Sequence, residues 1–265
     1  MRRFLMMGFL GVFAVSLASA QDWAKARLEK SPRHQEWVTV THGDRVVRCF
    51  VVYPEVSDKA PAVLVIHEIF GLTDWARGVA DQLAAAGYVA IAPDLVSGMG
   101  PGKGGTGDFA GRDDVIKAVS SLPADQVTAD LNATADYVKG LPSCSGHLAV
   151  AGFCWGGGQA FKFATHRSDL KAAFVFYGPP PDGDAIAGIQ CPVYGFYGGN
   201  DARISSTVPQ TKSRMKAARK SYVAVTYWGA GHGFMRAEED PDGNTANKKA
   251  HDEGWARLLV LLKGI

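Results

Sequence analysis

The sequence predicts an α/β domain in which a mostly parallel β-sheet carries helices on both faces, with an antiparallel hairpin at its N-terminal end. Continuous apolar runs such as "AVLVI" (62–66) are typical of buried parallel strands. These runs alternate along the chain with stretches of helical periodicity, which indicates a sheet covered on both faces. The hairpin is predicted by "EWVTVTHGDRVVRCFVVYP" (36–54), where two β-rich runs flank a His-Gly-Asp turn.

The first 20 residues are typical of a cleavable export signal and are set apart from the domain. Arg2 and Arg3 precede an apolar segment, and the small residues 18–20 form a cleavage site. A membrane-anchoring helix is the alternative, but the apolar segment (4–17) is short for a span of roughly 20 residues. We therefore expect a secreted or periplasmic protein whose mature domain covers 21–265, with no stable membrane anchor.

The composition fits one globular domain. The chain has 265 residues, and about 245 remain after the signal, which is enough for one large core. The formal net charge is +2, so we expect no nucleic-acid partner and interpret the basic cluster at 212–220 as an exposed helix face. Four cysteines are few for a disulfide scaffold. Apart from Cys154, at most one bridge can form among Cys49, Cys144 and Cys191.

After the hairpin, the predicted elements alternate between strands and helices. A strand at 62–68 leads into a helix over 73–87, with Thr73 or Asp74 as its N-cap and Gly87 at its end. A strand at 88–95 comes next. The remaining predicted elements are helix 125–140, strand 147–152, helix 155–167, strand 171–177, strand 192–197, helix 206–219, strand 222–227 and helix 247–263.

A glycine-rich interval without periodicity covers 97–114. It contains "GPGKGG", but Lys103 is followed by Gly104, where a phosphate-binding Walker loop needs serine or threonine. We therefore interpret 97–111 as a mobile loop over the site and leave open whether it closes as a lid.

Four reactive side chains follow four predicted strands. Each of Glu68, Cys154, Asp201 and His232 stands at, or shortly after, the C-terminal end of a strand. Ligands of doubly wound sheets bind at this edge, so the four side chains predict a single site. Each residue alone also has a structural interpretation: packing for the cysteine, a turn for Asp201 and a loop for His232.

The segment Gly-Phe-Cys-Trp-Gly (152–156) matches the nucleophile-elbow pattern G-x-S-x-G, with Cys154 in place of serine. The order of nucleophile, acid and histidine is that of α/β-hydrolases. A histidine partner and a helix N-terminus both favour the thiolate, and an acid on the far ring nitrogen fixes the histidine tautomer. These features predict a catalytic triad of Cys154, Asp201 and His232. By the same pattern, the backbone N–H groups of Trp155 and Ile69 would form the oxyanion hole.

At these residues the sequence resembles the dienelactone hydrolase family (carboxymethylenebutenolidases) of the α/β-hydrolase fold. The resemblance implies that Cys154 is the nucleophile, His232 the base and Asp201 its orienting acid. It also implies that Glu68 interacts with the cysteine in the resting enzyme and helps to activate it, whereas a helix N-terminal carboxylate is the structural alternative. The matching segments are "IHEIFGL" (66–72), "GYVAIAPDL" (87–95), "GFCWGG" (152–157), "GGNDARI" (198–204) and "GAGHGFMR" (229–236).

The resemblance extends to the substrate. Arg236 matches a family arginine that binds the substrate carboxylate, although a surface cation is the alternative, and Arg112 is the candidate for a second such arginine. His67 and His147 are expected to be packing or surface groups, because no metal-ligand spacing occurs.

We therefore expect a hydrolase that cleaves an ester or enol lactone of a small anionic substrate through a thioester, without a metal or an organic cofactor. Two alternatives stay open: the same machinery acting on another ester or thioester, and a thiol redox or binding protein that hydrolyses nothing. The natural substrate and the oligomeric state are also open.

Overall fold

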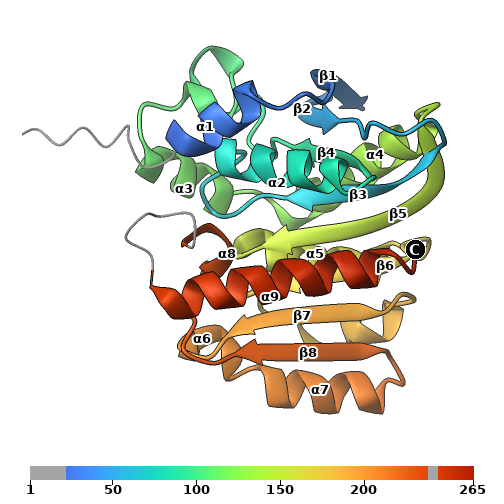
Figure 1. The fold of residues 1–265 in the computed structure, drawn as a ribbon, viewed down its shortest axis with the longest axis vertical. Coiled ribbons are helices and arrows are strands. Elements are labelled where there is room, and N and C mark those ends of the chain that lie inside the picture. Colours follow the sequence, from blue (N-terminus) through green and yellow to red (C-terminus); the bar gives the residue numbers. More distant parts are fainter. Residues whose placement is uncertain (1–21, 238–243) are drawn as a thin grey trace, which may run out of the picture.

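The computed structural model describes residues 22–237 and 244–265, so the predicted export signal lies outside the described residues. One eight-stranded sheet forms the centre, in the order β1-β2-β4-β3-β5-β6-β7-β8 (Figure 1). β1 pairs with β2, and β2 with β4, in antiparallel fashion, and all the other neighbours are parallel. The strands are β1 (Gln35–His42), β2 (Arg45–Val52), β3 (Ala60–Ile66), β4 (Val89–Pro93), β5 (Cys144–Phe153), β6 (Ala172–Phe176), β7 (Val193–Gly198) and β8 (Tyr222–Tyr227).

Helices cover both faces of this sheet (Figure 1). One apolar core lies under α1, α2 and α9, and the other under α4, α5 and α7. Within the described residues, none of the helices combines the length and the apolarity needed to cross a bilayer. The helices are α1 (Asp22–Glu29), α2 (Asp74–Ala85), α3 (Arg112–Ser120), α4 (Ala124–Gly140), α5 (Trp155–His166), α6 (Ala202–Ser205), α7 (Val208–Ala217), α8 (Phe234–Ala237) and α9 (Thr245–Leu262), with short 3₁₀ turns η2 (Pro101–Lys103), η3 (Thr106–Asp108) and η4 (Gly183–Gly188).

The predicted fold class is confirmed: the sheet is mostly parallel, has helices on both faces and begins with an antiparallel hairpin. The hairpin turns at Gly43, whose φ of 54° lies in the left-handed region that favours glycine. Thr73 is the N-cap of α2, and its hydroxyl accepts a hydrogen bond from the N–H of Ala76 at 3.4 Å.

The helices differ from the prediction in several places. The sequence pattern does not predict α1, which buries little more than Ala24 and Leu28, α3, which begins inside the glycine-rich interval, or the four-residue α8. The predicted helix 206–219 corresponds to α7 alone, and the short α6 that precedes it is not predicted. α7 has Pro209 in its first turn, a position where the missing N–H of proline costs no hydrogen bond.

The middle of the glycine-rich loop is hydrogen-bonded to the ends of two strands. The side chain of Asp94, just after β4, accepts from the N–H of Thr106 at 2.7 Å and from its hydroxyl at 2.8 Å. The same hydroxyl accepts from the N–H of Leu72 at 2.9 Å. The loop is therefore tied to the segment that follows β3, and its expected mobility stays a prediction.

Candidate active site

Cys154 stands on the sharp turn between β5 and α5. Its φ of 57° and ψ of −118° are unusual for a residue with a side chain, and they indicate local backbone strain. Glycines make this turn possible. A Cβ at Gly152 would collide with the carbonyl oxygen of Gly156, and a Cβ at Gly156 would collide with those of Ile66 and His67. The bend leaves the sulfur at the N-terminus of α5, where the helix dipole favours an anion.

His232 joins Cys154 to Asp201. Its Nε2 lies 3.1 Å from the Sγ of Cys154, and its Nδ1 lies 2.6 Å from the Oδ2 of Asp201. The hydrogen bond to Cys154, and with it the bond to Asp201, raises the pKa of His232 to about 9, although burial acts in the opposite direction. The imidazole therefore keeps its proton at neutral pH and meets the sulfur as a cation.

Backbone hydrogen bonds hold the loop that carries His232. The N–H of Asn200 donates to the carbonyl of Ala230 at 2.8 Å, and its side-chain amide donates to the carbonyl of Gly229 at 3.0 Å. From the other side, the N–H of Gly231 donates to the side chain of Asn247 in α9 at 2.8 Å. The loops after β7 and β8 are thus joined, which keeps the acid and the imidazole together.

Glu68 is bonded to Arg236. Its Oε2 accepts from the Nε of Arg236 at 2.8 Å, and its Oε1 accepts from the hydroxyl of Tyr177 at 3.4 Å. Burial raises the pKa of the Glu68 carboxyl, while the guanidinium of Arg236 opposes that rise. The resemblance implies a contact between Glu68 and the cysteine. Within the described chain Glu68 has no hydrogen bond to Cys154, because the guanidinium holds the carboxylate and the sulfur pairs with His232.

Both candidate arginines lie against one aromatic ring. The guanidinium carbon of Arg112 is 3.8 Å from the ring centroid of Phe70, and that of Arg236 is 5.2 Å from the same centroid. Phe70 follows Glu68 by two residues, so both cations lie next to the segment after β3. The positive charge of this part of the site suits an anionic group.

Two backbone donors lie at the same edge of the sheet. Ile69 belongs to the segment after β3, and Trp155 is the first residue of α5. Among the hydrogen bonds of the described residues, none is donated by the N–H of either residue. Both groups are therefore able to donate to an oxygen that enters the site.

Tyr177 and Phe70 are site residues that the sequence pattern did not predict. Tyr177 is fully buried, has a φ of 39° and packs edge-on against His232, with 5.1 Å between the ring centroids. The sequence does hold a signal for Tyr177, because it is the last residue of the predicted strand 171–177, just as Glu68 is the last residue of the predicted strand 62–68. The position alone does not separate it from a packing residue, because a tyrosine in an apolar strand is ordinarily part of the core.

The described residues contain no group of three or more His, Cys, Asp or Glu side chains placed to hold a metal ion. His67 is fully buried and His147 is exposed, in keeping with the packing and surface places expected for them.

Comparisons with known proteins show which sequences and folds this chain resembles. Residues 47–265 match the model of the "Dienelactone hydrolase family". A "Putative carboxymethylenebutenolidase" of Salmonella typhimurium is 34% identical over 219 residues, or 78% of each chain. One of the same name from Escherichia coli K12 is 30% identical over 252 residues, covering 85% of this chain and 90% of the relative. The crystal structure of a "Putative Dienelactone Hydrolase" from Klebsiella pneumoniae superposes with a TM-score of 0.77 at 27% identity, covering 88% of this chain and 99% of the other.

Proposed function

Because the chain belongs to the dienelactone hydrolase family, we propose that it hydrolyses an ester or enol lactone bearing a carboxylate, through a thioester on Cys154. One observation carries the proposal: the sulfur of Cys154 lies 3.1 Å from the Nε2 of His232, whose Nδ1 lies 2.6 Å from Asp201. A cationic imidazole and a helix N-terminus both favour the thiolate, which is the nucleophilic form of cysteine.

The proposed reaction has two steps. The thiolate of Cys154 attacks the substrate carbonyl, and the C–O bond to the leaving oxygen breaks as His232 gives that oxygen its proton. A thioester then links Cys154 to the acyl group. In the second step His232, now neutral, takes a proton from water, which attacks the thioester and releases the acid together with the thiolate. Asp201 fixes the ring orientation throughout.

The oxyanion formed in each step would be held by two backbone N–H groups, those of Ile69 and Trp155. Their freedom from protein acceptors supports this assignment. One such donor contributes a factor of about 10²–10³ to the rate.

The pair of Glu68 and Arg236 supports an anionic substrate. A substrate carboxylate would compete with Glu68 for the guanidinium of Arg236, and Arg112 lies across the Phe70 ring as a second cation. Competition of this kind frees the Glu68 carboxylate when substrate binds. We propose that the freed carboxylate then takes part in activating Cys154 by accepting the proton of its thiol, as the resemblance implies.

Matched pairs of p-nitrophenyl esters and enol lactones, with and without a terminal carboxylate, test this proposal. We expect the wild type to prefer the carboxylated members. Arg236→Ala should lower that preference by roughly tenfold to a hundredfold, the worth of one hydrogen bond to a charged group. Arg203→Ala, on the exposed side of α6, is the matched control and should keep the preference.

Three outcomes would count against parts of the account. Turnover that persists in Cys154→Ala would exclude Cys154 as the nucleophile. An unchanged preference for carboxylated substrates in Arg236→Ala would exclude Arg236 as the binding site of the substrate carboxylate. Thiol oxidation with no turnover of any ester in the wild type would favour the redox or binding alternative.

We also propose that the mature protein is exported, on the N-terminal pattern alone. Sequencing the N-terminus of the natively expressed protein should give residue 21 as its first residue, and an intact residue 1 would contradict the proposal.

A further inference from the structure

His67 is a buried histidine that the proposed reaction does not use. It follows β3, and none of its side chain is exposed to solvent. Burial lowers the pKa of its imidazole, so the ring is neutral at physiological pH. A neutral imidazole has one donor nitrogen and one acceptor nitrogen, and its neighbours determine which is which.

The hydrogen-bond partners of His67 assign its proton to Nδ1. The N–H of Leu95 points at Nε2 from 3.4 Å, which makes Nε2 the acceptor. Nδ1 lies 2.7 Å from the backbone carbonyl oxygen of Glu68 and therefore donates to it. The same carbonyl also accepts from the N–H of Gly71 at 3.2 Å.

The carbonyl that His67 holds belongs to the peptide unit between Glu68 and Ile69. No cis peptide bond occurs in the described chain, and in a trans peptide the C=O and the N–H point in opposite directions. Fixing the carbonyl toward His67 therefore fixes the N–H of Ile69 toward the other side of the unit. That N–H is one of the two free donors at the site.

The ring of His67 also contacts the residue that carries the second donor. It stacks on the indole of Trp155, with 5.5 Å between ring centroids and 15° between the ring planes. The backbone approaches closely here as well, since a Cβ at Gly156 would collide with the carbonyl oxygen of His67. One side chain thus touches both halves of the donor pair.

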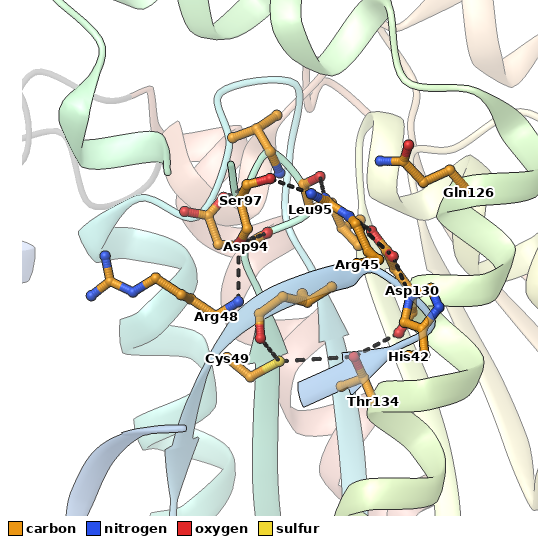
Figure 2. Close-up of polar contacts among 12 residues, drawn as sticks. His42, Arg45, Arg48, Cys49, Asp94, Leu95, Ser97, Gln126, Asp130 and Thr134 are labelled. Carbon is orange, nitrogen blue, oxygen red and sulfur yellow. Dashed lines mark hydrogen bonds and ion pairs between the residues drawn. The ribbon is translucent and has the colours of Figure 1, made fainter. Parts of the chain in front are cut away.

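On the other side of His67 lies Leu95, which is bonded to the ion pair of Arg45 and Asp130 that Figure 2 shows. Leu95, whose N–H points at His67, has its carbonyl bonded to the Nη2 of Arg45 at 2.9 Å. Arg45 is in turn paired with the fully buried carboxylate of Asp130 on α4, at 3.1 Å. Because Arg45 donates both to the Leu95 carbonyl and to the Asp130 carboxylate, the backbone of Leu95 is tied to α4.

From these contacts we propose that His67 is a positioning residue for the oxyanion hole: its Nδ1–H aims the N–H of Ile69 at the substrate oxygen, and its ring steadies Trp155. The inference rests on the proposed function, because it assigns these two N–H groups to the oxyanion. His67 itself touches neither the substrate nor the sulfur.

Two reactions of Cys154 distinguish a misplaced oxyanion donor from general damage to the folded structure. Acyl transfer from a p-nitrophenyl ester passes through an oxyanion, whereas alkylation by iodoacetamide needs the thiolate but forms no oxyanion. In His67→Phe, which keeps a ring against Trp155 but loses both hydrogen bonds, we expect the burst of p-nitrophenol to slow by roughly 10²-fold, the effect of losing one oxyanion donor. The alkylation rate should stay within about twofold of the wild type, because the His232 pair is untouched.

A second pair of variants tests the hydrogen bond alone and also serves if His67→Phe does not fold. The amide nitrogen of His67→Asn lies near the place of Nδ1 and is able to donate to Glu68, whereas His67→Ala has no donor. We expect acyl transfer in the asparagine variant to exceed that in the alanine variant at least about tenfold, with equal alkylation rates. The defect should appear in kcat and leave KM nearly unchanged.

Equal losses in acyl transfer and alkylation would overturn the inference, because they indicate structural damage only. Unchanged acyl transfer in His67→Phe, or equal rates in His67→Asn and His67→Ala, would also overturn it while the proposed function stands. No release of p-nitrophenol from any ester by the wild type would remove the proposed function and this inference together.

Discussion

In the contact between Cys154 and His232, the imidazole carries a charge that a free histidine mostly lacks at pH 7. Holding charge in a partly buried site is unfavourable unless other groups compensate. Here the N-terminus of α5 lies beside the sulfur, and Asp201 lies behind the imidazole. The charge held at this contact therefore depends more on the groups around it than on the two side chains themselves.

The titration of His232 tests this pair. Because its pKa is raised to about 9 from an ordinary 6.5, the wild-type imidazole should stay protonated through neutral pH and lose its proton near pH 9. Cys154→Ala removes the largest cause of the rise, so its imidazole should lose the proton at a lower pH than in the wild type. Histidine NMR signals followed from pH 5 to about 10 report both midpoints. Equal midpoints in the two proteins would contradict the pairing.

Residue types and strand ends were enough to locate the core of the site from sequence. The ends of predicted strands singled out Glu68, Cys154, Asp201 and His232, and the fold brings all four to one edge of the sheet. The bond between Glu68 and Arg236 could not be predicted, because it depends on how α8 folds back over the end of β3. The role of Tyr177 was hidden for a similar reason, since a tyrosine in an apolar strand is ordinarily a packing residue.

At the scale of elements, the bend between β5 and α5 decides where the nucleophile stands. The first turn of α5 lies directly against the end of β3, so close that a methyl group at Gly156 has no space between the carbonyls of Ile66 and His67. Backbone carbonyls at the end of a central strand cannot swing away as a flexible side chain can. The glycine is therefore required by contact with a neighbouring element.

Two glycine variants test that requirement. Gly156→Ala should lower the free energy of unfolding by about 1–3 kcal/mol or more through overpacking, and it should abolish turnover by moving α5. Gly78→Ala is the matched control in α2, where a Cβ meets no atom within 4 Å, and it should raise stability by up to about 1 kcal/mol. Denaturant unfolding measures both changes. Similar effects of the two substitutions would contradict the close approach of α5 and β3.

Helices and strands with a regular pattern of apolar residues could be predicted from the sequence, and those without such a pattern could not. The alternation of strands and helices from 62 onward gave the correct order, because burial on both faces of a parallel sheet imposes continuous apolar strands. α1 contributes few buried positions, and α3 begins directly after a glycine-rich run, so neither produces a pattern long enough to identify.

At the scale of the whole molecule, the fold separates one accessible thiol from three buried ones. All four cysteines are unpaired. Cys49, Cys144 and Cys191 lie in the core between the sheet and its α4 and α5 face, whereas Cys154 is partly exposed. Burial raises the pKa of Cys49 to about 12 and that of Cys191 to about 11, which keeps these two thiols protonated and unreactive.

The number of cysteines that a thiol reagent modifies in the native protein therefore tests this distribution. A small disulfide reagent should modify one cysteine in the native state, Cys154, and four in denaturant. Cys154→Ser should reduce both counts by one. A disulfide found by non-reducing peptide mapping, or fast native labelling of a second cysteine, would contradict this distribution of thiols.

The most direct test of the account is mass spectrometry of the intact protein and its peptides after mixing with a slowly hydrolysed ester. The account predicts one added acyl group, carried by the peptide that contains Cys154, present in the wild type and missing from Cys154→Ala. An acyl group on a different residue, or hydrolysis of the ester with Cys154 absent, would contradict it.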